Sequence, residues 1–198
     1  MIKFENISQQ DPYIRFVEVY KKALHAKQNN IEAVCISSFS KINSEVDARF
    51  VNIKKVVNDN FIFFSNYNSP KSDQFSSHDQ VSLTFYWSSI NVQIRMKGNI
   101  KKTSKKISQE HFKNRDSKKN ALAISSNQSQ KMISYNFILH KYSETLENSN
   151  LHDCPDYWGG FVVKPYYFEF WEGEDSRINR RESFSFDGKD WKNFYLEP

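Results

Sequence analysis

The chain has 198 residues, and its 28 lysine and arginine residues against 23 acidic ones give a formal net charge of +5. This length favours a single domain, and an aromatic content of 16% supplies material for its core. No apolar run reaches the roughly 18 residues of a membrane-spanning helix, and no secretion signal begins the chain. Cys35 and Cys154 lack disulfide-motif or metal-site spacing. We therefore expect a reduced, cytoplasmic protein that does not associate with a membrane.

The positive charge is concentrated in one segment. Between Arg95 and Lys119 there are ten lysine and arginine residues and only two acids, so the remainder of the chain is net acidic. Such a segment can bind phosphate groups, but a charge run by itself is more often a solvated face. Nucleic-acid binding is not favoured, because Phe112 is the only aromatic residue available there for base stacking.

In the first third of the chain, the pattern predicts one helix followed by three strands. Asp11 and Pro12 are typical of a helix start, and apolar side chains then recur at helical spacing as far as Leu24. Apolar runs bounded by turn residues predict strands at Ala33–Ile36, Ala48–Val57 and Phe61–Phe64. The turn at 58–60 would join the last two strands in a hairpin.

The rest of the chain alternates between strand and helix patterns. Period-two alternation predicts strands at Val81–Trp87 and Val92–Lys97, and helices are expected at Ser108–Arg115 and Ser126–Tyr142. The final strands are expected at Phe161–Val163, Tyr167–Trp171, Phe184–Phe186 and Trp191–Leu196, the first two separated by Pro165. Six to eight strands with short turns and about three helices predict a mainly β protein, an antiparallel barrel with helices packed outside it.

Several common chemistries are absent from the sequence. There is no dinucleotide-binding GxGxxG, no P-loop, no HExxH and no GxSxG motif, and the five histidines show no ligand spacing. We therefore expect no metal chemistry.

Four groups of polar and aromatic residues remain as candidates. They are the strand Arg49–Lys54, the strand end and turn Phe64–Lys71, the amides Gln93 and Gln128 with Ser129, and the C-terminal cluster from Trp158 to Arg181. Arginine forks beside an indole suit a planar anion, and a lysine with hydroxyls and free backbone N–H groups can hold a phosphate. Taken singly, each group is more often structural than functional.

Together these motifs resemble the pyridoxamine 5′-phosphate oxidase family, the flavoproteins that complete pyridoxal phosphate synthesis. The C-terminus carries the most specific match. The family's WGG-[FY], EFWxG, R-L-H-[DE]-R and final W…L-x-P correspond to Trp158–Phe161, Glu169–Gly173, Arg177–Arg181 and Trp191…Leu196–Pro198. Upstream, its R-x-V-x-x-K, F-[YF]-[ST]-N, Q-V-x-x-x-G and Q-S motifs correspond to Arg49–Lys54, Phe63–Asn66, Gln93–Gly98 and Gln128–Ser129.

The resemblance implies a split β-barrel that forms a homodimer and binds FMN in a cleft between subunits. One domain would span 1–198, with a helix within 1–30 and dimerisation and active-site strands within 155–198. The implied FMN ligands are Arg49, Phe50, Val51, Asn52, Lys54, Phe64, Ser65, Lys71, Gln93, Gln128, Ser129, Trp171 and Arg181. The implied substrate ligands are Lys54, His111, Arg115, Ser117, Arg177 and Asn179, of which Arg177 and Asn179 would be catalytic.

The implied reaction transfers a hydride from pyridoxamine or pyridoxine 5′-phosphate to FMN, with dioxygen as the final acceptor. The sequence departs from the family at Pro70, His111, Asn179 and Arg180, which replace a basic residue, a tyrosine, a histidine and an acid. Asparagine cannot carry a proton near neutral pH, whereas histidine can. The alternative is therefore a relative that keeps FMN but oxidises another substrate, such as an intermediate of a phenazine pathway.

Overall fold

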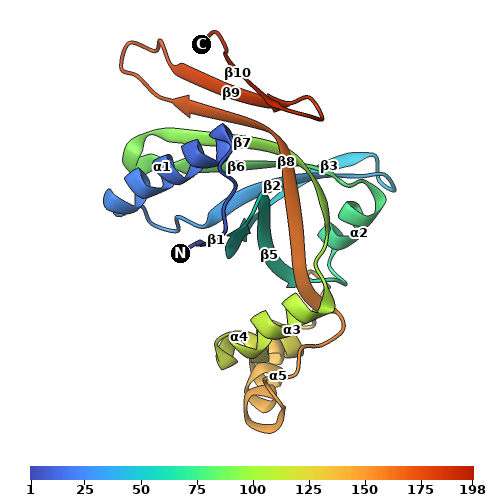
Figure 1. Ribbon diagram of the computed structural model, residues 1–198. Coiled ribbons are helices and arrows are strands. Elements are labelled where there is room, and N and C mark those ends of the chain that lie inside the picture. Colours follow the sequence, from blue (N-terminus) through green and yellow to red (C-terminus); the bar gives the residue numbers. More distant parts are fainter.

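Strand β8 (Trp158–Glu172) is the longest strand and connects the two parts of a ten-stranded sheet. In this computed structural model, which describes residues 1–198, β8 pairs along its length with β7 (Val92–Lys102). Its first half also pairs with β5 (Asn60–Asn66), and its second half pairs with β9 (Arg180–Phe186). Figure 1 shows β8 running from a group of helices at the bottom to the C-terminal hairpin at the top.

The remaining strands complete a sheet that stays open. They are β1 (Lys3–Glu5), β2 (Ala33–Ser40), β3 (Glu45–Asn52), β4 (Lys55–Val57), β6 (Gln80–Trp87) and β10 (Trp191–Tyr195). The order is β1-β4-β5-β8-β7-β6-β2-β3, and the hairpin of β9 and β10 extends from β8. All pairs are antiparallel except β1 with β4. The predicted mainly β, split-barrel fold is confirmed, with a mixed rather than wholly antiparallel sheet.

Helix α1 (Asp11–His25) covers one face of this sheet and forms the main core with it. The helix buries Tyr13, Phe16, Val19, Tyr20 and Ala23, which recur at helical spacing. The ring of Phe16 packs against those of Phe61, Phe85 and Trp87, with centroids 5.0, 5.7 and 5.8 Å away. Here the sequence prediction of the helix is confirmed, because its apolar stripe matches the face that the sheet covers.

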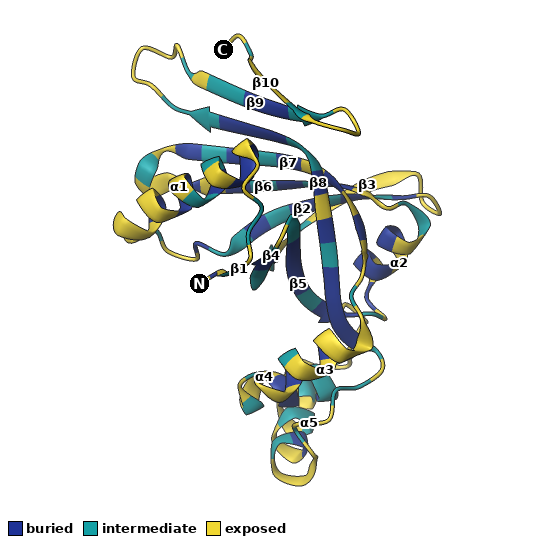
Figure 2. Ribbon diagram, in the orientation of Figure 1, coloured by how far each residue is buried: buried dark blue, intermediate teal, exposed yellow.

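Three helices pack together at the end of β8 that lies away from the C-terminal hairpin. We call these three helices the helical unit. It consists of α3 (Lys105–Lys113), α4 (Ser117–Ser125) and α5 (Tyr135–Asn148), and most of its residues are exposed (Figure 2). The Oγ of Ser108 accepts a hydrogen bond from the N–H of Gly160, 3.1 Å away. A Cβ atom on Gly159 would clash with Tyr67 and Ser108, and one on Gly160 with Thr103. The two glycines therefore allow the helical unit to contact β8 closely.

The helix predictions fail where polar segments lack an apolar period. Helix α2 (Pro70–Ser77) begins with proline in its first turn, in a segment expected to be only a turn. A short 3-10 helix, η1 (Ser88–Ile90), joins β6 to β7. The helix predicted at 126–142 is wrong in its first half, because α4 ends at Ser125 and α5 begins only after Ser134, whose hydroxyl caps it. None of the helices is long and apolar enough to cross a membrane.

The strand predictions fail at two changes of partner. The predicted strand 48–57 is broken after Asn52, because β3 pairs with β2 whereas β4 pairs with β5 and β1. Conversely, Pro165 does not divide β8. Lys97 is opposite Tyr167 and Gly98 is opposite Pro165, so a bulge absorbs the residue between them.

Replacement of Phe16 with alanine tests the core. Because the side chain is fully buried among four other aromatic rings, we expect Phe16→Ala to lower the free energy of unfolding by about 3–5 kcal/mol. Ile14→Ala on the same helix, where the side chain is 41% exposed, should cost under about 1 kcal/mol. Urea unfolding measures both, and equal losses would contradict the assignment of the core.

Candidate functional site

Three of the predicted flavin-binding residues lie side by side on one face of the sheet. Gln93 on β7 is opposite Trp171 on β8, which is opposite Arg181 on β9. Residues paired in this way project to the same face. The other face carries Phe168 and Phe170, and it packs towards α1. We call Gln93, Trp171 and Arg181 the polar row; each is half-buried.

Arg49 is fixed in a network between β3 and α2. Its Nη1 donates to Ser38 Oγ at 2.6 Å and its Nη2 to Gln74 Oε1 at 2.7 Å. The carboxylate of Asp47 also pairs with Nη2. Ser38 and Gln74 carry no recognisable motif in the sequence, because they approach Arg49 only through the pairing of β2 with β3 and the position of α2.

Lys71 lies beside this network on the first turn of α2 and is only 7% exposed. Its Nζ donates to Ser69 Oγ at 3.0 Å. Burial, followed by the positive charge of Arg49, lowers the pKa of Lys71 to about 8, although Asp47 opposes the shift. A desolvated ammonium next to a guanidinium provides a favourable location for an anion.

A second cationic location is a cavity of about 300 Å³ between β5 and α4, which we call the cationic cavity. Arg115 and Lys119 line it together with Ser65 and Gln128, and none of its lining residues is acidic. Gln128 Oε1 accepts from Ser65 Oγ and from the N–H of Asn66, each at 3.4 Å. These predicted ligands, which are 63 residues apart in sequence, therefore meet in the structure.

Lys119 was not among the predicted site residues, whereas Ser117 was. Asp116 caps α4 by accepting hydrogen bonds from the N–H groups of Lys118 and Lys119, which places Ser117 in the first turn. Two helical positions two residues apart point in nearly opposite directions. Lys119 lines the cationic cavity and Ser117 does not, so the role of Ser117 stays a prediction. The exposed Ser129 follows Gln128 in the next loop with a φ of 67°.

His111, Phe64 and Trp158 form an aromatic stack at the edge of the cationic cavity. The His111 and Phe64 rings are 3.6 Å apart and 5° from parallel, and the Phe64 and Trp158 rings are 5.5 Å apart. The guanidinium of Arg115 lies 5.1 Å from the Trp158 ring centre. Burial, then the charges of Arg115 and nearby lysines, lowers the pKa of His111 to about 4. Its imidazole is therefore neutral at physiological pH.

The strand Arg49–Lys54, which was predicted to line the flavin, matches its predicted arrangement only in part. Phe50 is 76% exposed, Asn52 is exposed and Val51 is half-buried. Lys54 was expected to share a strand face with Phe50 and Asn52, but β3 ends before it. Instead, Lys54 Nζ lies 3.5 Å from a carboxylate oxygen of Glu32.

Arg177 and Asn179 lie in the loop 173–179 between β8 and β9, at the opposite end of β8 from the helical unit (Figure 1). Asn179 Oδ1 accepts from the N–H of Glu174 at 3.1 Å. Arg177 has a φ of 62°, and its guanidinium makes no hydrogen bond or ion pair. A single chain therefore does not bring Arg177 and Asn179 next to Arg115.

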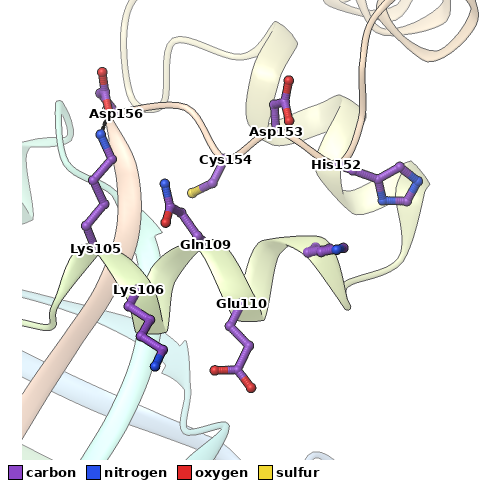
Figure 3. A pocket seen from close by; sticks show the side chains of 9 residues that line it. Lys105, Lys106, Gln109, Glu110, His152, Asp153, Cys154 and Asp156 are labelled. Atoms are coloured by element: carbon purple, nitrogen blue, oxygen red, sulfur yellow. Dashed lines mark hydrogen bonds and ion pairs between the residues drawn. The ribbon is translucent and has the colours of Figure 1, made fainter.

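A larger cavity, of about 570 Å³, lies between α3 and residues 152–156 (Figure 3). Lysines and acids both line it, and Lys105 Nζ pairs with Asp156 at 2.7 Å. Burial, followed by the Asp156 charge, raises the pKa of the Cys154 thiol. Because the thiol stays protonated and the charges are mixed, this cavity has neither a nucleophile nor a net cationic lining.

His111 gives a prediction about acid stability. Between pH about 6.5 and 4 the unfolded chain binds a proton that the folded histidine resists, so stability falls as pH decreases through that range. We expect His111→Phe, which keeps a ring on Phe64, to lose less stability than the parent between pH 7 and pH 4. Urea unfolding at both values measures this, with the exposed His140→Phe as control. An unchanged pH dependence in His111→Phe would contradict the histidine's burial.

Comparison with known proteins gives concordant results. The family described as "Pyridoxamine 5'-phosphate oxidase" matches residues 20–147, and the "Pyridoxine 5'-phosphate oxidase C-terminal dimerisation region" matches residues 158–198. A pyridoxine/pyridoxamine 5'-phosphate oxidase of Hydrogenovibrio crunogenus is 33% identical over 195 residues, which cover 96% of this chain and 89% of that protein.

Two solved structures share the fold. PhzG from Burkholderia lata 383, solved with tetrahydrophenazine-1-carboxylic acid, has a TM-score of 0.90 at 20% identity and covers 96% of this chain and 93% of its own. A pyridoxamine 5'-phosphate oxidase-related, FMN binding protein of Nostoc punctiforme has a TM-score of 0.77 at 14% identity, covering 91% and 96%. With sequence motifs, fold and family matches in agreement over nearly its whole length, this chain is an oxidoreductase that belongs to the pyridoxamine 5'-phosphate oxidase family.

Proposed function

We propose that this protein binds FMN and oxidises pyridoxamine or pyridoxine 5′-phosphate, with dioxygen as the final acceptor. The observation that carries the proposal is the cationic cavity, where Gln128 bonds to Ser65 beside Arg115 and no acidic residue is part of the lining. Such a lining attracts a phosphate, which both the cofactor and the substrate contain. Family membership supports the flavin, as does the description of the Nostoc relative as FMN binding.

The donors present fit FMN. The phosphate would be held by Arg49, Lys71, Ser65, Gln128 and Ser129, and it would give the desolvated Lys71 an anion to which its ammonium can donate. The polar row would contact the ring system, for which its amide, indole and guanidinium supply donors and a flat surface. Because the polar row and the cationic cavity lie at opposite ends of β8, one chain of a homodimer would supply the phosphate donors and its partner the polar row. The remaining ring contacts come from Phe50, Val51, Asn52, Lys54 and Phe64.

The site is completed in a homodimer. The matched C-terminal region is described as a dimerisation region, and large apolar side chains are left on the surface of the single chain. Val46 and Phe50 on β3 are 72% and 76% exposed, and Ile178 in the loop 173–179 is 73% exposed. A second copy that covers these side chains brings one chain's loop to the other chain's cationic cavity.

Within that site the chain's residues orient the substrate. Lys54, Arg115 and Ser117 anchor its phosphate, and the neutral His111 donates a hydrogen bond to it. Arg177 and Asn179 hold the substrate ring, and Arg177 stabilises negative charge near its oxygen. When bound, FMN would supply the hydride acceptor, and dioxygen would be the final acceptor. Holding the ring and phosphate together makes the transfer effectively unimolecular.

A second candidate is a family member that oxidises a different substrate. It is favoured by Asn179, whose side-chain oxygen is already engaged with the backbone of Glu174 and which cannot carry a proton. An intermediate of a phenazine pathway is one such substrate. A protein that binds flavin but turns over neither pyridoxamine 5′-phosphate nor pyridoxine 5′-phosphate would support this candidate.

Lys71→Gln tests the FMN site. We expect it to raise the FMN dissociation constant by roughly 10- to 100-fold, because a charge-assisted hydrogen bond to the phosphate is lost. Quenching of flavin fluorescence on titration measures the constant, and the exposed Lys101→Gln serves as the control. A protein that binds no FMN at all would refute the proposed function.

Asn179→His tests the reaction. Because histidine can exchange a proton with the substrate, we expect this change to raise kcat on pyridoxine 5′-phosphate by roughly tenfold. Hydrogen peroxide release measures turnover, with Asn148→His at an exposed helix end as the matched control. An equal kcat in the parent and in Asn179→His would show that Asn179 does not limit this activity.

A further inference from the structure

Next to the polar row, on the same face of the sheet, lies a second row of residues that contains a buried carboxylate. Glu169 precedes Trp171 by two residues on β8, so it projects from the same face. Glu169 is only 2% exposed. Arg95 on β7 and Ser183 on β9 are directly opposite it in the two neighbouring strands. A carboxylate is thus enclosed beside the proposed flavin surface rather than in the apolar core.

The two oxygens of Glu169 have different partners. Oε1 accepts from Arg181 Nε at 3.0 Å and from Arg181 Nη2 at 2.9 Å. Oε2 accepts from Arg95 Nη1 at 3.0 Å and from the Tyr167 hydroxyl at 3.1 Å. One oxygen therefore serves only the guanidinium of the polar row, while the other ties the carboxylate to β7 and to its own strand.

Arg181 is held from a second direction as well. Its Nη1 donates to the backbone carbonyl of Glu197 at 2.7 Å. A planar guanidinium with bonds from Nε, Nη2 and Nη1 has no remaining freedom to rotate about its last side-chain bonds. These bonds leave further N–H donors free. Arg181 is thus presented to a ligand in one orientation, next to Trp171.

Stability alone does not account for this arrangement. Buried ion pairs give little net stability, because desolvation offsets the attraction, and apolar residues of similar size often serve as well. A buried carboxylate that fixes one functional arginine is instead typical of pre-organisation, in which the orientation is set before the ligand arrives.

We propose that Glu169 is a positioning residue for the flavin, acting through Arg181. The inference rests on the proposed function, since it requires that FMN lies against the polar row. Glu169 itself would not contact the cofactor. Its Oε1 fixes the plane of the Arg181 guanidinium, and that plane determines how Arg181 binds the flavin ring.

Glu169→Gln is the central test. The amide keeps the shape but loses the charge that holds both Arg181 nitrogens, so we expect roughly tenfold weaker FMN binding and an altered absorbance spectrum of the bound flavin. Tyr167→Phe is the matched control, because it removes one bond from Oε2 and leaves Oε1 intact. It should change the FMN dissociation constant by no more than roughly twofold.

A double-mutant cycle separates positioning from general damage. In an Arg181→Ala background, Glu169→Gln should cause no further loss of FMN affinity. Thermal unfolding of the FMN-free proteins monitors folding. If Glu169→Gln does not fold, Glu169→Asp keeps the buried charge but shortens the reach to Arg181, and it should weaken FMN binding in the same direction.

These experiments distinguish a failure of the positioning role from a failure of the proposed function. Glu169 variants that fold and bind FMN like the parent, with its spectrum, would overturn the positioning role while leaving the proposed function intact. An additive loss in the Arg181→Ala background would also overturn it. A parent protein that binds no FMN would refute the proposed function, and the positioning role with it.

Discussion

The hydrogen bonding of β8 is the constraint on which the rest of the structure depends. A strand has two edges, and β7 occupies one edge of β8 along its length. The other edge is shared, with β5 pairing as far as Val163 and β9 beginning at Tyr167. The exchange of partners occurs around Pro165, which has no N–H to donate. The barrel and the C-terminal hairpin are therefore two parts of one sheet, and the two halves of the proposed site lie at opposite ends of the same strand.

Sequence patterns predicted best those elements whose two faces differ. The strand Val81–Trp87 and helix α1 were correct because each has one apolar side that meets the core. Helices α2 and α4 are rich in polar residues, so no apolar period marked them. The division of 48–57 depends on which strand each half pairs with, and that is a tertiary property.

The candidate site was predicted at the level of motifs rather than of contacts. The motifs identified Gln93, Trp171 and Arg181, and the strand register then placed them in one row. Glu169 also stands within a recognised motif, but nothing in the sequence showed that its carboxylate is enclosed by two arginines. Lys119 was missed because its direction depends on where the cap of α4 falls.

The close contact at Gly159 and Gly160 has a consequence for the helical unit. Because Gly159 and Gly160 have no Cβ atom, Ser108 of the unit approaches the backbone of β8 closely enough to accept a hydrogen bond from the N–H of Gly160. In the same unit, Tyr135 and Phe137 of α5 are 68% and 52% exposed, and Ile133, just before α5, is 90% exposed. The absence of side chains at two positions of β8 therefore helps to fix where these exposed apolar side chains lie relative to the sheet.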